Sequence, residues 1–271
     1  MNGKPLTREL IADPGRYRLM MSLGERSLHV VAACTAGDEE AVADTVGLAD
    51  DSARALEEAV YANPMLLLPF ARTDVVAVTG RVHILPPSTA GCTDAVDALT
   101  GIFDDDHPVA LADGIDTHTS ALMLLQRERV NFIRRTFDRA AMHSHLAVLG
   151  RYLTRRSRLG NSGKVFVNLR PDSLDILAFN SFGLAAANTF ATSDDSDAAY
   201  YALAVARECG LAADADEFII SGDRRRRASV SETLRRFAPA VVPLIVPASA
   251  TAHLPKSANV PLELIVLPLC E

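Results

Sequence analysis

Segments that favour β-structure occur in the same order twice along this 271-residue chain. In the first half, residues 17–34 predict two strands around a turn at Gly24, where a positive φ would suit a hairpin. A helix and two strands follow, at residues 51–62, 75–79 and 82–85. The second half predicts strands at 164–169, 174–180 and 184–191, a helix at 194–209, a strand at 218–221, a helix at 229–237 and a strand at 241–246. No residue-level repeat aligns the halves, but the repeated order predicts an α/β fold of two lobes with a cleft between them.

The segment at residues 159–163 is rich in glycine and polar residues, which makes it the best candidate for a boundary between the lobes. We therefore assign residues 1–158, ending in a basic connecting helix, to an N-terminal lobe and residues 159–271 to a C-terminal lobe. Further patterns predict helices at 93–102, 130–137 and 146–158 and strands at 120–126 and 262–269.

Composition excludes several classes of protein. The chain has 27 Lys and Arg against 34 Asp and Glu, a formal charge of −7, so we do not expect nucleic acid as a partner. No apolar run is long enough for a membrane span, and the first fifteen residues are too charged for a signal peptide. The four cysteines form no C-x-x-C pair, which argues against a zinc ribbon and favours reduced thiols and a cytoplasmic location.

Short segments spread over nearly the whole chain resemble a known family. They are residues 17–34, 131–137, 187–190, 200–203, 221–223 and 269–271. The family they resemble is a Bacteroidetes family of unknown function with an actin-like ATPase fold, in the superfamily of actin, sugar kinases, Hsp70 and the pilus-assembly protein PilM. The resemblance implies duplicated ribonuclease H-like lobes around a central cleft.

The resemblance also implies where a nucleotide would bind. Active members carry an Asp-x-Gly-Thr/Ser turn in each lobe, whose carboxylates organise Mg²⁺ while backbone N–H groups contact phosphate. Here the first turn reads Ser22-Leu-Gly-Glu-Arg26 and the second reads Asn168-Leu-Arg-Pro-Asp172, so both acids are replaced. The adenosine loop of the superfamily is rich in glycine, whereas Ser221-Gly-Asp223 supplies one. The cleft candidates are Gly24, Glu25, Asn168, Asp172, Ser221, Gly222 and Asp223.

Other constellations have simpler structural explanations. Residues 160–165 lack the spacing of a phosphate-binding P-loop. His143 and His145 could face a metal from one strand, but no third ligand stands at a recognisable spacing. Asp194 is expected to cap a helix. Ser229-Val-Ser-Glu232 fits a capping box, which would leave Arg224–Arg227 in a solvated loop, available to an acidic protein partner.

These observations favour a non-catalytic protein of actin-like ATPase fold that binds a protein partner or a cleft ligand. We expect no metal site and no required cofactor, because the acids that would hold Mg²⁺ with ATP are replaced. The alternative is an active ATPase or kinase with an unconventional metal site built from Glu25, Asp172 and Asp223. A nucleic-acid accessory role would depend on the Arg224–Arg227 run and the basic helix alone.

Overall fold

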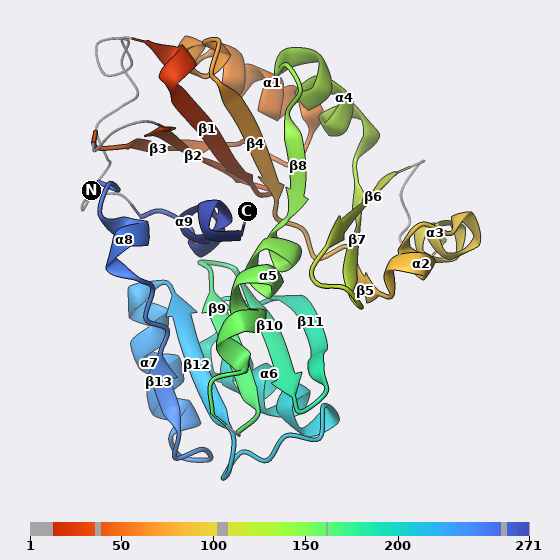
Figure 1. Cartoon of the computed structure of the whole chain (residues 1–271), viewed down its shortest axis with the longest axis vertical. Coiled ribbons are helices and arrows are strands. Elements are labelled where there is room, and N and C mark those ends of the chain that lie inside the picture. Colours follow the sequence, from red (N-terminus) through yellow and green to blue (C-terminus); the bar gives the residue numbers. More distant parts are fainter. Residues whose placement is uncertain (1–12, 36–38, 102–107, 161, 256–258, 271) are drawn as a thin grey trace.

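The computed structural model describes residues 13–35, 39–101, 108–160, 162–255 and 259–270, and two five-stranded sheets dominate it (Figure 1). The first has the order β3-β2-β1-β4-β8, with β1, β2 and β3 antiparallel and β4 and β8 parallel to β1. Its strands are β1 (Tyr17–Leu23), β2 (Ser27–Cys34), β3 (Val42–Gly47), β4 (Arg72–Ala77) and β8 (Ala141–Ser144). Helices α1 (Ala53–Tyr61) and α4 (Arg127–Thr136) cover one face, where alternate apolar residues of β1 and β2 pack on Leu56, Val60 and Phe132.

The second sheet repeats this topology, with the order β11-β10-β9-β12-β13. Its strands are β9 (Lys164–Leu169), β10 (Ser173–Asn180), β11 (Gly183–Ala191), β12 (Glu217–Gly222) and β13 (Val241–Pro243). Strands β9, β10 and β11 are antiparallel, and β12 and β13 run parallel to β9. Helices α6 (Asp195–Glu208) and α7 (Arg224–Leu234) pack on one face. Matching strand orders confirm the predicted duplicated α/β architecture.

A small third sheet lies to one side of the first lobe (Figure 1). It has the order β5-β7-β6 and is fully antiparallel. The elements of this insertion are β5 (Val82–Leu85), α2 (Pro87–Ala90), α3 (Thr93–Thr100), β6 (Val109–Gly114) and β7 (Ser120–Leu125). Short 3-10 turns elsewhere are η2 (Pro14–Arg16), η3 (Pro64–Leu67) and η4 (Leu267–Cys270).

Helix α5 (His145–Ser157) lies between the two large sheets (Figure 1). Its residues Leu146–Leu149 are fully buried in a core cluster that includes Met20 of β1 and Phe179 of β10. The short helix α9 (Leu262–Val266) joins the same cluster, after α8 (Ala248–Thr251). One apolar core therefore runs from the first lobe through α5 into the second. Among the helices described, none has the length and apolar character needed to cross a bilayer.

Several predicted elements are wrong or incomplete. Residues 262–269 form α9 and η4, not a strand, since a short apolar run has the same composition in a buried helix. Helix α7 begins at Arg224, five residues before the predicted Ser229. The turn at Gly24 forms without a positive φ. No sequence pattern predicted β3, β6, α2 or α8, and residue 102 of the predicted helix 93–102 lies outside the described residues.

Candidate functional site

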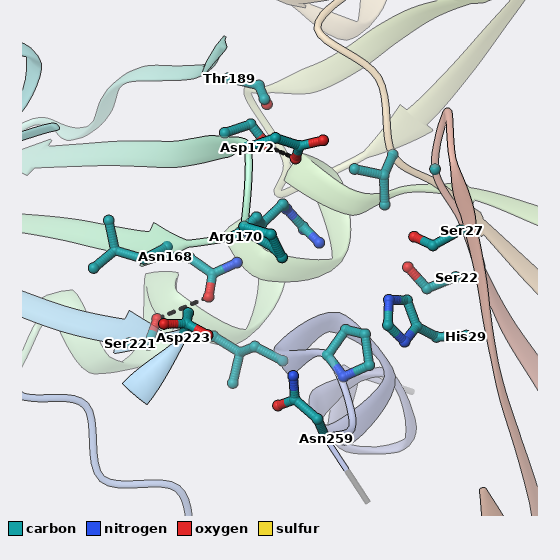
Figure 2. Close-up of a pocket in the computed structure, with 18 of the residues that line it drawn as sticks. Ser22, Ser27, His29, Asn168, Arg170, Asp172, Thr189, Ser221, Asp223 and Asn259 are labelled. Carbon is teal, nitrogen blue, oxygen red and sulfur yellow. Dashed lines mark hydrogen bonds between the residues drawn. The ribbon is translucent and has the colours of Figure 1, made fainter. Parts of the chain in front are cut away.

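A cavity of about 730 Å³ opens between the two lobes. The β1–β2 turn, the β9–β10 turn, the end of β12 and the C-terminal segment all contribute to its walls. Figure 2 shows Ser22, Ser27 and His29 on one side and Asn168, Ser221 and Asp223 on the other. All seven residues selected from the sequence line this cavity: Gly24, Glu25, Asn168, Asp172, Ser221, Gly222 and Asp223. Their contact with a ligand stays a prediction.

The two turns at the cavity are structural equivalents. In the first, the Gly24 amide donates to the Ser27 carbonyl at 2.9 Å, and in the second, the Arg170 amide donates to the Ser173 carbonyl at 2.9 Å. Counting back two residues pairs Ser22 of β1 with Asn168 of β9, and both side chains are buried. The position that holds glycine in the first turn therefore holds an arginine in the second.

The Arg170 side chain is the centre of a buried charged network. Its Nη1 and Nη2 atoms donate to the two carboxylate oxygens of Glu263, each at 3.1 Å. Its Nε donates to Asp175 Oδ2 at 3.0 Å, and Asn168 Nδ2 donates to the same oxygen at 3.0 Å. Ser22 Oγ donates to Glu263 Oε1 at 2.6 Å. One guanidinium thus pairs with two carboxylates that have no exposure to solvent.

Burial and charge act in opposite directions on the two carboxylates. Burial would raise the pKa of each, but the Arg170 charge and the hydrogen bonds outweigh it, so the pKa of Asp175 and the pKa of Glu263 are both lowered. Burial would lower the pKa of Arg170, and the two carboxylates raise it instead. All three groups are therefore ionised near neutral pH.

His143 and His145, considered above as a metal-binding pair, contact different residues. His145 begins α5, and its Nε2 lies 3.1 Å from Asp175 Oδ1 and 2.9 Å from Thr189 Oγ1, while its Nδ1 lies 3.1 Å from the Ala77 carbonyl. His143 Nε2 instead lies 3.1 Å from Asp74 Oδ1 in the first lobe. Among the described residues, no group of three His, Cys, Asp or Glu side chains could hold a metal ion.

Helix α7 begins at the edge of the cavity, and Asp223 caps it. The Asp223 carboxylate accepts from the Arg225 and Arg226 amides at 2.9 and 3.0 Å. Ser229 is exposed inside the helix, so the predicted capping box is wrong. Asp194 caps α6 as predicted, accepting from the amides of Ser196 and Asp197.

The four consecutive arginines do not form one solvated patch. Arg226 is buried, and its Nη1 donates to the carbonyls of Arg170 and Thr192 at 2.6 and 3.0 Å, while its Nε pairs with Asp195 at 3.0 Å. Arg227 lines the cavity, and Arg224 and Arg225 are exposed. The expectation of a contact surface made of all four arginines is therefore wrong for Arg226. Its position on α7 directs its side chain inward, toward the β9–β10 turn and the start of α6.

The roles of Arg170, Asp175 and Glu263 were not predicted from the sequence. Arg170 stands in a turn already selected, but nothing nearby in the sequence shows that its counter-ions are five and ninety-three residues away. Glu263 lies inside an apolar run that reads as a core element. A lone acid in such a run is the one available signal, since a buried carboxylate needs a partner.

Comparisons with known proteins agree with this architecture. A family model described as "Protein of unknown function (DUF3822)" matches residues 10–241. No curated protein matches the chain. A Bacteroides thetaiotaomicron protein with an actin-like ATPase fold and unknown function is 18% identical, with a TM-score of 0.77 over 96% of this chain and 98% of that one. A chain of the PilM–PilN type IV pilus biogenesis complex is 11% identical, with a TM-score of 0.50 over 92% and 94% of the two chains. The actin-like ATPase fold implied by the resemblance is confirmed.

Proposed function

Since the chain belongs to the family described as "Protein of unknown function (DUF3822)", with an actin-like ATPase fold, we propose that it acts by binding and does not hydrolyse ATP. The bound species is a partner protein or a ligand in the interlobe cleft. In this proposal, the residues that contact it include Gly24, Glu25, Asn168, Asp172, Ser221, Gly222 and Asp223, between lobes at residues 1–158 and 159–271.

The observation that carries the proposal is the chemistry of the two equivalent turns. Mg²⁺ is usually held by carboxylates together with substrate phosphates. Where active members of the superfamily carry these carboxylates, Ser22 offers a hydroxyl and Asn168 an amide. The Asn168 side chain is already hydrogen-bonded to Asp175 and Ser221. Asp175 and Glu263 do carry charge near the cleft, but both are paired with Arg170, so neither carboxylate could bind a metal without giving up that ion pair.

The acids of the alternative hypothesis give it little support. Figure 2 shows Asp172 and Asp223 apart, with Asn168 and Arg170 between them in this view. The Asp223 carboxylate is used by the first amides of α7. Glu25 stands on the opposite lobe, in the β1–β2 turn. An ATPase built on these three acids would require them to converge on one ion.

The cavity itself supports binding. Its volume of about 730 Å³ lies within the range of small-molecule sites, roughly 300–1,000 Å³. Its lining combines hydroxyl side chains with apolar residues such as Val246, Val260 and Ile265. In the PilM–PilN complex, a chain of related fold is assembled with another protein, and this supports a protein partner as one form of the proposal.

Thermal melts with and without millimolar Mg-ATP test the proposal. A ligand at one hundred times its dissociation constant stabilises a folded protein by about 2.7 kcal/mol, or roughly 5–11 °C in Tm for a domain of this size. We expect no such rise and no release of phosphate. A rise of that size that is lost in Asp172→Ala or Glu25→Ala would replace the proposal with the active-enzyme alternative.

An acidic partner would meet three arginines, not four. Arg224 and Arg225 are exposed and Arg227 lines the cleft, whereas Arg226 stabilises the lobe. The matched test therefore replaces Arg224, Arg225 and Arg227 with Ser and retains Arg226. Loss of association with a flatter salt dependence would support this contact surface, and unchanged association at low salt would remove it from the proposal.

A further inference from the structure

Glu263 is held by both lobes at once. Its Oε1 accepts from Ser22 Oγ, at the end of β1, at 2.6 Å. Both of its oxygens accept from the Arg170 guanidinium, directly after β9, at 3.1 Å. Ser22 and Arg170 belong to the equivalent turns of the two lobes. The carboxylate therefore bridges the same structural feature on either side of the cleft.

The chain around Glu263 also packs on both lobes. Residues Leu262, Leu264, Val266 and Leu267 are buried in the core cluster that holds Met20 of β1, Leu146 of α5 and Phe166 of β9. Asn259, Val260, Pro261, Leu262 and Ile265 form part of the cavity wall. Upstream, the His253 carbonyl accepts from the Ala41 amide of the first lobe at 2.7 Å. After β13 completes the second sheet, the chain thus returns to the first lobe.

The charges make the bridge costly to break. Glu263 and Asp175 have no exposure, and Arg170 is the guanidinium with which both are paired. If the two turns moved apart, Glu263 would lose Ser22 or Arg170, and a buried carboxylate without its partner is strongly unfavourable. The apolar contacts of α9 alone would not impose this geometric requirement.

We propose that residues 259–270 form a C-terminal strap that fixes the separation of the two lobes. The Glu263–Arg170 ion pair and the Ser22–Glu263 hydrogen bond hold this strap in place. The strap sets the width of the cleft whether or not the cleft holds a ligand. The inference therefore stands apart from the proposed binding function.

Interlobe distances measured on the full chain test the strap. Arg54 of α1 and Arg207 of α6 are exposed, in different lobes, and their ion pairs are on the surface. Replacing both with p-acetylphenylalanine allows spin labels to be attached without disturbing the native cysteines. Double electron–electron resonance then gives the distribution of distances between the lobes.

The test variants are Glu263→Gln and Ser22→Ala, and the matched control is Glu217→Gln. Glu217 pairs with Lys164 at 3.0 Å inside the second lobe, so its loss removes an ion pair without touching the strap. We expect Glu263→Gln to broaden the distance distribution by about twofold or more and to shift it to longer distances, as in a hinge opening. Ser22→Ala should act in the same direction with a smaller effect, and Glu217→Gln should match the parent chain.

A folded Glu263→Gln variant with the parent distribution would overturn the proposal. If Glu263→Gln does not fold, Ser22→Ala decides, because it leaves the Arg170–Glu263 pair intact and removes the bond from the first lobe. An unchanged distribution in Ser22→Ala would then overturn the proposal. Equal broadening in Glu217→Gln would also overturn it, because the effect would then be a general loss of stability and not specific to the strap.

Discussion

At the scale of single residues, Gly222 illustrates how closely the backbone strands approach beneath the cleft. Its φ is +92°, and a Cβ at this position would lie 2.0 Å from the Leu169 carbonyl oxygen of the neighbouring strand. Backbone cannot move aside as a flexible side chain would. Glycine is therefore required here for two independent reasons, conformation and space.

We predict that Gly222→Ala destabilises the protein by about 3 kcal/mol or more, or prevents folding. The matched control is Gly183→Ala, whose φ is +117° but whose Cβ would meet nothing within 4 Å. That change should cost only about 1–2 kcal/mol for the backbone conformation. Urea unfolding of both variants measures the difference. Equal losses of unfolding free energy would show that the Leu169 backbone moves to make room for the added methyl group.

Asp74 is a second residue whose surroundings determine its chemistry. The side chain is fully buried, and it accepts from Arg18 at 2.7 Å, from Arg72 at 2.8 Å and from His143 at 3.1 Å. Burial alone would raise its pKa, but the hydrogen bonds of His143 and Arg18 and the charge of Arg18 lower the pKa to about 2.

Because the pKa of Asp74 is lower in the folded state than in the unfolded chain, its ionisation stabilises the fold above about pH 4. That contribution, about 2 kcal/mol, should be lost as the pH falls from about 4 to about 2. Asp74→Asn should therefore be less stable than the parent at neutral pH, and the gap should close across that window. Urea unfolding at a series of pH values checks this, and a gap independent of pH would contradict it.

At the scale of elements, the start of α7 is set by Asp223 and not by Ser229. Asp223 accepts from two amides of the first turn, whereas Ser229 is exposed within the helix. We predict that Asp223→Ala lowers the free energy of unfolding by about 1 kcal/mol, while Ser229→Ala changes it by less than about 0.5 kcal/mol. Chemical denaturation compares the two, and a larger loss in Ser229→Ala would restore the capping box.

The elements also show what the sequence can predict. Periodicity and turn residues locate most strands and helices of both lobes, because β9, β10 and α6 each have a distinct pattern and end at Gly or polar residues. The run at 262–269 fails because it is buried on several sides, so its apolar residues show no period. Turn positions predicted the cavity lining, but the Arg170 network joins residues far apart in sequence, which no local pattern encodes.

At the scale of the whole molecule, the two lobes share a core cluster in addition to the one that each has of its own. Residues of β1, α5, β10 and α9 pack in the shared cluster, so separating the lobes would expose buried apolar surface to water. A shared core favours unfolding as one cooperative unit. The chain contains no tryptophan, so a single tryptophan introduced into one lobe would report on the unfolding of that lobe alone.

We predict that Tyr61→Trp in the first lobe and Tyr200→Trp in the second report the same urea midpoint. Both tyrosines are exposed, so the substitutions should disturb little. Tryptophan fluorescence of each variant, compared with circular dichroism of the parent, gives the midpoints. Two midpoints that differ beyond error would show that the lobes unfold separately despite the common cluster.

The charged triad of Arg170, Asp175 and Glu263 also restricts how this protein can change during evolution. Loss of Arg170 would leave two fully buried carboxylates without their cation, whereas loss of either acid still leaves Arg170 with one counter-ion. A lineage that abandons the triad must therefore lose an acid before Arg170, or pass through a poorly folded intermediate. Among descendants of one ancestor, Arg170 should therefore be retained wherever both acids are present, although ninety-three residues of chain separate it from Glu263.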